Sequence, residues 1–218
     1  MKTSFAIVAA LSASATMALG AASGIAQDAP EIPGVVDVSR IQAGSYATDP
    51  AHTVIQWEVD HFGFNPYFGL FGDVEGTMAF DPANVEATTL DVTIPVTSLA
   101  VVSSGLREHM LRPGKDGGSP DFFGPTPPAA KFTTTDVRQI GGTSAVATGD
   151  LTLNGQTREV SLLVEFTGAG KNPVNETETI GFTATTDVER SDFGIGYAIP
   201  MVSDTVELTI TAAFERQP

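Results

Sequence analysis

Cysteine is missing from all 218 residues of the sequence. This absence excludes a disulfide framework, and it excludes a lipid anchor attached through a cysteine. The fold must therefore be held together by a hydrophobic core, and a chain of this length can bury one.

Positive charge is scarce. Lysine and arginine together number 11 and aspartate and glutamate 26, so the formal net charge is −15 at pH 7. An acidic surface repels the phosphates of nucleic acids and of anionic membranes. We therefore expect no nucleic-acid partner.

Long apolar runs are also scarce, and the most apolar segment lies at the N-terminus. Lys2 is followed by apolar and small residues from Phe5 to Leu19, and Gly24-Ile25-Ala26 offers small residues for cleavage. This pattern predicts a secretory signal peptide at residues 1–26. The run is too short and too rich in serine and alanine for a membrane span. We expect a periplasmic protein without a stable membrane anchor.

The remaining chain divides into a leader and one domain. Residues 27–43 contain Pro30, Pro33 and Gly34 among scattered acidic residues, so we interpret them as a flexible N-terminal leader with a short strand at Val35 to Val38. No internal repeat or domain boundary follows. Residues 44–218 are predicted to form a single barrel domain, present as a monomer or a homodimer.

Catalytic motifs are absent as well. The sequence has no Gly-x-Ser-x-Gly elbow, no His-Glu-x-x-His helix and no phosphate-binding glycine loop. His52, His61 and His109 are the best acid–base or metal-ligand candidates, and Glu108 could join the last two. Their spacing does not require a metal. Asp192 and Glu189 could form a carboxylate pair beside Arg190, but we expect Arg190 and Asp192 to tie a turn together instead. We expect no enzyme, no metal and no cofactor, with a histidine-based metal-binding protein or enzyme as the alternative.

Alternation of apolar and polar residues is the pattern that dominates the chain. Ile55, Trp57 and Val59 share one face of a predicted strand, because successive side chains of a strand point to opposite faces. Continuing this count places His61 on the same apolar face. A buried imidazole needs a hydrogen-bond partner, so the interior must hold at least one polar group.

Similar alternation predicts further strands along the chain, and a change of period predicts one helix. The other predicted strands are 74–80, 89–96, 132–137, 145–153, 160–166, 180–188 and 206–214. Asn154-Gly155 favours a tight hairpin turn. Leu99, Val102, Leu106 and Met110 recur at helical spacing after Ser98, which predicts a helix that is capped by Ser98 and ends near Pro113. Residues 64–69 are predicted to be a turn, and 114–128 a loop holding Phe122 and Phe123.

About eight strands joined by short turns favour an all-β antiparallel meander. Eight such strands can close into a barrel, which removes exposed edges and can just hold one ligand. A two-sheet sandwich is the competing architecture. Small residues at predicted inward positions, such as Ala145, Ala147 and Ala184, favour space inside the barrel. A filled core that presents Phe122 and Phe123 to a protein partner is the other alternative.

Several motifs occur together in one order. They are Asp49-Pro50-Ala51-His52, Val59 to Phe64 (Val-Asp-His-Phe-Gly-Phe), Gly76 to Pro82 (Gly-Thr-Met-Ala-Phe-Asp-Pro), Arg107-Glu108-His109, Asp121-Phe122-Phe123, Gly149 to Gly155 (Gly-Asp-Leu-Thr-Leu-Asn-Gly) and Arg190 to Gly194 (Arg-Ser-Asp-Phe-Gly). In this order the chain resembles the YceI-like family over residues 44 to 215. Residues 110–119 look like an insertion relative to that family.

The resemblance implies an eight-stranded antiparallel lipocalin-like barrel with one helix near its opening. It also implies a bacterial periplasmic protein that holds an isoprenoid quinone, a polyprenyl phosphate or a similar lipid-like amphiphile inside the barrel. Arg107, His109, His61 and Asp192 are expected at the mouth, or as anchors of the helix at its rim. The full set of expected ligand contacts is Trp57, Val59, His61, Phe64, Phe80, Val92, Ile94, Leu106, Arg107, His109, Met110, Phe122, Phe123, Leu162, Phe166, Phe182, Asp192 and Phe193.

Overall fold

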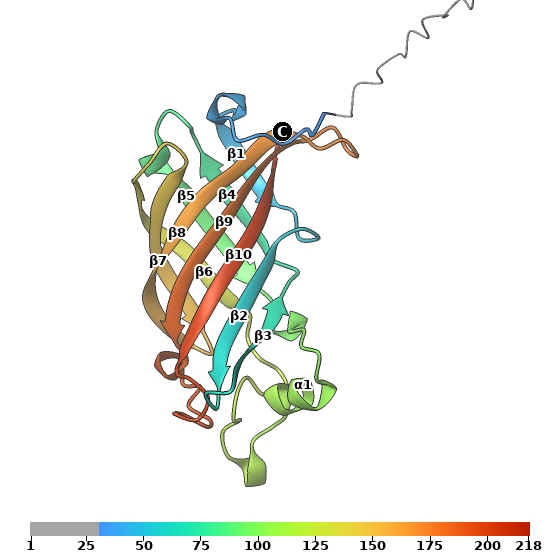
Figure 1. Ribbon diagram of the computed structural model, residues 1–218, viewed down its shortest axis with the longest axis vertical. Coiled ribbons are helices and arrows are strands. Elements are labelled where there is room, and N and C mark those ends of the chain that lie inside the picture. The colour runs from blue at the N-terminus through green and yellow to red at the C-terminus, as the bar shows by residue number, and fades with distance from the viewer. Residues whose placement is uncertain (1–30) are drawn as a thin grey trace, which may run out of the picture. The chain divides into compact units, whose positions relative to one another are not determined.

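The computed structural model describes residues 31–218, and the predicted signal peptide at residues 1–26 lies outside the described residues. Strands dominate the described part (Figure 1). They are β1 (Gly44–Thr48), β2 (Val54–His61), β3 (Asn65–Phe71), β4 (Glu75–Phe80), β5 (Thr89–Ile94), β6 (Ala130–Gln139), β7 (Ser144–Leu153), β8 (Gln156–Lys171), β9 (Glu178–Glu189) and β10 (Thr205–Arg216). The helices are α1 (Ser104–Leu111) and the short 3₁₀ turns η1 (Val38–Arg40), η2 (Val85–Ala87), η3 (Val96–Ser98), η4 (Lys115–Gly117) and η5 (Arg190–Phe193).

The sheet closes into an antiparallel barrel. The strands from β4 to β10 pair in sequence order, and β1 pairs with both β4 and β10, which completes a ring of eight. Further along β10, β2 takes the place of β1 and β3 pairs with β2. The predicted eight-stranded barrel is confirmed. Two strand positions of the ring are each split into two strands, one into β1 and β2 and the other into β4 and β3. Ten strands therefore form the ring and its extension.

The barrel has two distinct ends. The helix end carries α1, the turn between β2 and β3, the turn between β7 and β8, and η5 (Figure 1). The far end carries the β6–β7 turn at residues 140–143 and the β8–β9 turn at residues 172–177. At the helix end β5 leads into η3, α1 and a long loop before β6 begins, so irregular segments complete the wall there.

The hairpin turn at the helix end of β2 differs from the prediction. Residues 64–69 were expected to form the turn, but the turn lies at 62–64, where Phe62 and Gly63 have φ angles of 60° and 67°. Residues from Asn65 onward form β3, paired with β2 through contacts such as Val59 with Tyr67. Pro66 is tolerated because it lies near the start of an edge strand. The predicted Asn154-Gly155 turn is confirmed, with φ angles of 52° and 77°.

The predicted helix start is also corrected. Helix α1 begins at Ser104, and the Ser103 side chain accepts a hydrogen bond from the Leu106 amide at 3.2 Å. Ser98 instead donates to the Pro95 carbonyl (2.6 Å) and accepts from the Gly72 amide (3.0 Å), which ties η3 to the end of β3. Val102 is fully exposed and lies before α1, so the apolar residues from Leu99 to Met110 do not belong to one continuous helix.

The described part of the predicted leader lies against β8. The Val35 amide donates to the Ala169 carbonyl (3.2 Å), and the Ala169 amide donates to the Val35 carbonyl (2.9 Å). Gly170 permits this close approach, because an added Cβ would lie 2.7 Å from the carbonyl carbon of Pro33. Ile41 is only 7% exposed. From Pro33 onward this segment is therefore fixed to the barrel rather than free.

Among the described residues, no helix combines the length and the apolar character needed to cross a bilayer.

Candidate ligand-binding site

The interior of the barrel is hollow and divides into two chambers. The far chamber has a volume of about 260 Å³ and the helix-end chamber about 610 Å³. Their walls share four aliphatic residues, Ile55, Ile94, Leu151 and Leu208. These four form a waist between the chambers. A filled core, the alternative drawn from the sequence, is therefore wrong.

The far chamber lies in the regular part of the ring. The predicted residues that face it are Phe80, Val92, Ile94, Leu162, Phe166 and Phe182. Ala145, Ala147 and Ala184 face it as well, and their small side chains leave space between the aromatic rings. Thr48 and Thr53 are buried polar residues on its wall, and their hydroxyls donate to the Val74 carbonyl (2.9 Å) and the Ala213 carbonyl (3.3 Å).

The helix-end chamber is larger and is walled partly by irregular segments. The predicted residues that face it are Trp57, Val59, His61, Ile94, Leu106, His109, Met110, Phe122, Phe123 and Phe193. Phe62, Tyr197 and Met201 also line it and are 46%, 45% and 57% exposed. Side chains that line a chamber and also meet solvent mark its opening. The chamber thus opens between the β2–β3 turn and the segment that follows η5.

Three predicted contact residues do not line either chamber. Phe64 is 86% exposed on the β2–β3 turn, and Asp192 is exposed in η5. The Arg107 side chain donates to the Leu99 carbonyl (3.0 Å) and the Thr97 carbonyl (3.2 Å). Arg107 therefore anchors α1 to η3, which is the second of the two roles expected for it. Phe64 and Asp192 lie outside both chambers, and contact of either residue with a ligand stays a prediction.

His109 ties the helix to the loop that follows it. Its Nε2 lies 2.8 Å from Asp121 Oδ2, and Arg112 Nη2 lies 3.1 Å from the same oxygen. Hydrogen bonds from His109 and Arg112 hold the pKa of the Asp121 carboxyl below its usual range. The His109 ring also packs edge-on against Phe122 and Tyr197, with centroids 5.2 and 5.0 Å apart. His109 is thus part of the chamber wall.

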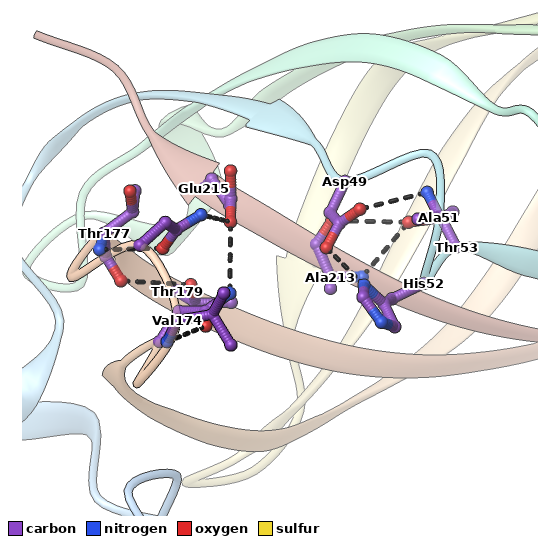
Figure 2. A network of polar contacts seen from close by, with 11 residues as sticks. Asp49, Ala51, His52, Thr53, Val174, Thr177, Thr179, Ala213 and Glu215 are labelled. Carbon is purple, nitrogen blue, oxygen red and sulfur yellow. Dashed lines mark hydrogen bonds and ion pairs between the residues drawn. The ribbon is translucent and has the colours of Figure 1, made fainter.

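The other histidines lie apart from this cluster. His52 pairs with Asp49 in the turn between β1 and β2, where its side chain is 73% exposed (Figure 2). His61 lies at the helix end of β2. Within residues 31–218, no group of three or more acidic or histidine side chains converges to hold a metal ion. The metal-binding alternative gains no support from the geometry.

Arg190 is a buried cation with a structural role. Its residue is 6% exposed, and burial lowers the pKa of the guanidinium. Nε donates to the Ser203 carbonyl (2.8 Å), and Nη2 donates to the Val202 carbonyl (3.0 Å). Nη1 donates to the carbonyls of Ile195 and Tyr197, both at 2.9 Å. Arg190 therefore holds the loop after η5 against the chamber.

The carboxylate in this loop is not the one expected. Asp192 was expected to help Arg190 fix the turn, but Asp204 takes that position. Asp204 accepts hydrogen bonds from the Ser191 amide (2.8 Å) and the Ser191 hydroxyl (2.6 Å). Spacing along the sequence favoured Asp192, because only the fold brings residues 191 and 204 together.

Two polar atoms of the helix-end chamber have no partner. Trp57 is 7% exposed, and both its Nε1 and the Tyr67 hydroxyl are buried without a hydrogen bond to the described residues. A buried polar group without a partner costs about 1–3 kcal/mol. The third such atom, Arg216 Nε, belongs to a residue outside both chambers. Both unsatisfied atoms therefore belong to residues that line the helix-end chamber, but each atom is itself fully buried and does not face the open space.

Tyr67 was missed because residues 64–69 were interpreted as a turn. Its signal is the alternation of Tyr67, Gly69 and Phe71, which places all three on the face opposite Phe68. Gly69 pairs with Trp57, and an added Cβ would lie 2.7 Å from Cε2 of the indole. The absence of a side chain at Gly69 thus allows the indole to lie across β3.

Fold and cavity together define the class: a closed antiparallel β-barrel with a mainly apolar interior cavity. The chain belongs to the YceI-like family, because the model of the YceI-like domain matches residues 46–214. It is 33% identical over 181 residues to a UPF0312 protein of Ectopseudomonas mendocina, an alignment that covers 82% of this chain and 91% of the relative. A UPF0312 protein of Pseudomonas fluorescens is also 33% identical and covers 81% and 89%.

Solved structures have the same fold. The Campylobacter jejuni YceI protein is 28% identical with a TM-score of 0.59, covering 73% of this chain and 90% of that one. Burkholderia cenocepacia BcnA is 22% identical with a TM-score of 0.61, covering 76% and 98%. A polyisoprenoid binding domain from Saccharophagus degradans, implicated in plant cell wall breakdown, is 11% identical with a TM-score of 0.53 and covers 81% and 100%. The last two support the fold alone.

Proposed function

We propose that this protein binds one long apolar molecule, an isoprenoid or similar lipid-like amphiphile, inside the barrel and does not transform it. The observation that carries this proposal is the pair of apolar chambers that share a wall at the waist. Ligand pockets usually enclose about 300–1,000 Å³ and are lined mainly by apolar side chains with a few polar groups. The helix-end chamber is within that range.

The arrangement of the chambers gives the ligand a direction. The far chamber is lined mainly by aliphatic and aromatic side chains, with Gln139, Thr143 and Ser144 at its outer end, so its inner part suits a hydrocarbon tail. The helix-end chamber opens to solvent beside Phe62, Tyr197 and Met201, so the polar end of an amphiphile would lie there. The polyisoprenoid binding domain from Saccharophagus degradans, which has the same fold, is consistent with a ligand of this kind.

We also propose that the protein is exported to the periplasm and works there without a membrane anchor. The support is the predicted signal peptide at residues 1–26. Intact-mass measurement of the protein from a Gram-negative host checks this directly. The expected chain begins near Gln27 and is released with the periplasmic fraction. An unprocessed chain in the cytoplasmic fraction contradicts the proposal.

Native mass spectrometry of the protein purified from its host tests binding. The expected spectrum contains a complex of one chain with one apolar molecule, and organic extraction removes the added mass and yields an isoprenoid or lipid. The extracted protein should then recover the complex when the molecule is returned. Repeated isolation of the bare chain, together with no recovery when isoprenoids are added, contradicts the proposal.

A further inference from the structure

Apolar side chains gather on the outside of the barrel at its helix end. Phe64, on the β2–β3 turn, is 86% exposed, and Phe68 on β3 is 57% exposed. Phe68 and Leu70 point outward, because the alternate residue Tyr67 lines the chamber on the other face of the strand. A soluble protein rarely exposes several large apolar side chains together unless that surface meets a partner.

This outer surface continues into the helix-end chamber. Phe62 and Met201 line the chamber and are also exposed to solvent. The Phe62 amide donates to the Met201 carbonyl (2.8 Å), which joins the β2–β3 turn to the loop after η5. We call Phe62, Phe64, Phe68, Leu70 and Met201 the apolar rim. Because two of its members line the chamber, an apolar molecule that contacts the apolar rim already lies beside the cavity.

The two segments that carry the apolar rim have carboxylates and no lysine or arginine. Residues 54–72 contain Glu58 and Asp60, and residues 191–204 contain Asp192 and Asp204. β3 itself holds no charged residue, although it is an edge strand that pairs along its length only with β2. Edge strands of soluble proteins commonly carry charges that prevent association. The surface beside the chamber is therefore apolar at its centre and negative at its borders.

This charge pattern favours one kind of partner. A second copy of the chain in a two-fold contact would bring the same carboxylates face to face, and an anionic membrane would repel them. The head groups of a zwitterionic bilayer include ammonium groups, which attract carboxylates, and exposed aromatic side chains partition into the interface of a bilayer. A bilayer is also where an apolar ligand is dissolved, since such a molecule is disfavoured in water.

We infer that the apolar rim docks reversibly on a zwitterionic lipid surface and holds the helix-end chamber against the bilayer with which the protein exchanges its ligand. This inference rests on the proposed binding function and adds the surface at which the ligand is taken up or released. Docking is reversible, because five side chains on a turn, an edge strand and a loop bury far less apolar area than a membrane-spanning segment.

Flotation of the delipidated protein with lipid vesicles measures docking in the absence of a ligand. Wild type should float with vesicles of phosphatidylcholine. Vesicles that also contain phosphatidylglycerol should bind less protein at low salt, because their negative charge repels the carboxylates beside the apolar rim. Added salt should reduce this difference, since it screens exposed charges.

Substitution of the most exposed residue of the apolar rim tests which surface docks. Phe64→Ser should weaken the partitioning onto phosphatidylcholine vesicles by about tenfold, the effect of withholding one aromatic side chain from the interface. Val174→Ser is the matched control, because Val174 is 90% exposed on the β8–β9 turn at the far end of the barrel. Its flotation should equal that of wild type. Both residues are exposed, so neither substitution should unfold the chain.

Three results would overturn the inference. The first is wild type that does not float with phosphatidylcholine vesicles, and the second is Phe64→Ser that floats as well as wild type. The third is a dimer in sedimentation equilibrium that Phe64→Ser dissociates, which would assign the apolar rim to a second copy of the chain. Native mass spectrometry of the lipid complex keeps the two proposals apart. A complex that persists without flotation leaves the binding function intact, whereas loss of both contradicts both.

Discussion

The two chambers of the barrel are built differently. The far chamber is enclosed mainly by the regular ring, where alternate residues of paired strands point inward and the buried Thr48 and Thr53 hydroxyls are satisfied by backbone carbonyls. Only its outer end is lined by η1, η2 and the β6–β7 turn. The helix-end chamber is enclosed partly by η3, α1 and the loops at residues 112–129 and 194–204. Its wall includes the buried Arg190, two of the three histidines, and Trp57 and Tyr67 with their unpartnered polar atoms.

This difference separates two tasks within one cavity. Regular strands provide an apolar wall of fixed spacing, which suits a hydrocarbon chain that needs no specific contact. Irregular segments bring together polar side chains from distant parts of the sequence, which suits the recognition of a head group. Disrupting one region should therefore change either chain-length preference or head-group preference, but not both.

The largest effect is expected from removing the cation that holds the helix-end wall. Arg190→Met leaves four backbone carbonyls without their donor, so the free energy of unfolding should fall by about 3–5 kcal/mol. Urea denaturation measures this loss. Arg158→Met, an exposed arginine on β8, is the matched control and should change stability by less than about 0.5 kcal/mol. Equal effects of the two substitutions would contradict the structural role given to Arg190.

A smaller effect is expected where Trp57 lies across β3. In Gly69→Ala the added Cβ would overlap the indole and lie 2.6 Å from Val101 Cγ1, so the variant should lose about 2 kcal/mol of stability. Trp57 is the sole tryptophan of the chain, and its emission spectrum should shift as the indole moves. Gly72→Ala, where nothing lies within 4 Å of the added Cβ, should leave the spectrum unchanged. An unshifted spectrum in Gly69→Ala would contradict this packing.

Filling the far chamber should shorten the preferred ligand. Ala184→Phe adds a ring to the wall of that chamber. If two methylenes are excluded, affinity for a long chain falls by somewhat more than tenfold, since each buried methylene contributes about 0.8 kcal/mol. Affinity for a short chain should be retained. Leu163→Phe is the control, since Leu163 is 46% exposed and faces outward. Titration with a series of chain lengths measures the longest chain that still gains affinity. This length should be shorter in Ala184→Phe and unchanged in Leu163→Phe.

The smallest effect concerns acid. The pKa of Asp121 is depressed in the folded state by hydrogen bonds from His109 and Arg112. A carboxyl with a depressed pKa contributes stability above its unfolded pKa of about 4 and loses it as pH falls through the folded value. At neutral pH the urea concentration at the midpoint of unfolding should therefore be higher for wild type than for Asp121→Asn. The difference between the two midpoints should shrink below about pH 4. A constant difference at all pH values would contradict the assignment.

The sequence was informative for the regular half of the molecule. Strict alternation predicted most strands, and Asn154-Gly155 located a hairpin, because both signals are local. Inward positions such as Phe80 and Phe182 followed from parity alone. The closure of the ring also followed, because eight antiparallel strands with one apolar face have few other ways to bury it.

The irregular half could not be predicted in the same way. Ser98 and Ser103 are equally good cap residues, and only the contact of Ser98 with Gly72 decides between them. The pairing of Ser191 with Asp204 depends on a loop path that spacing does not encode. The unpartnered state of the Tyr67 hydroxyl is a property of its whole surroundings. Such features depend on contacts between distant residues.

The most direct test of a tail in the far chamber and a head group beside Trp57 is quenching of the tryptophan by nitroxide-labelled lipid esters. Two esters of the same chain length are compared, one with the nitroxide next to the ester group and one with it at the end of the chain. The label next to the ester should quench Trp57 strongly, and the label at the chain end only weakly. Equal quenching by both labels, or stronger quenching by the chain-end label, would contradict this placement of the ligand.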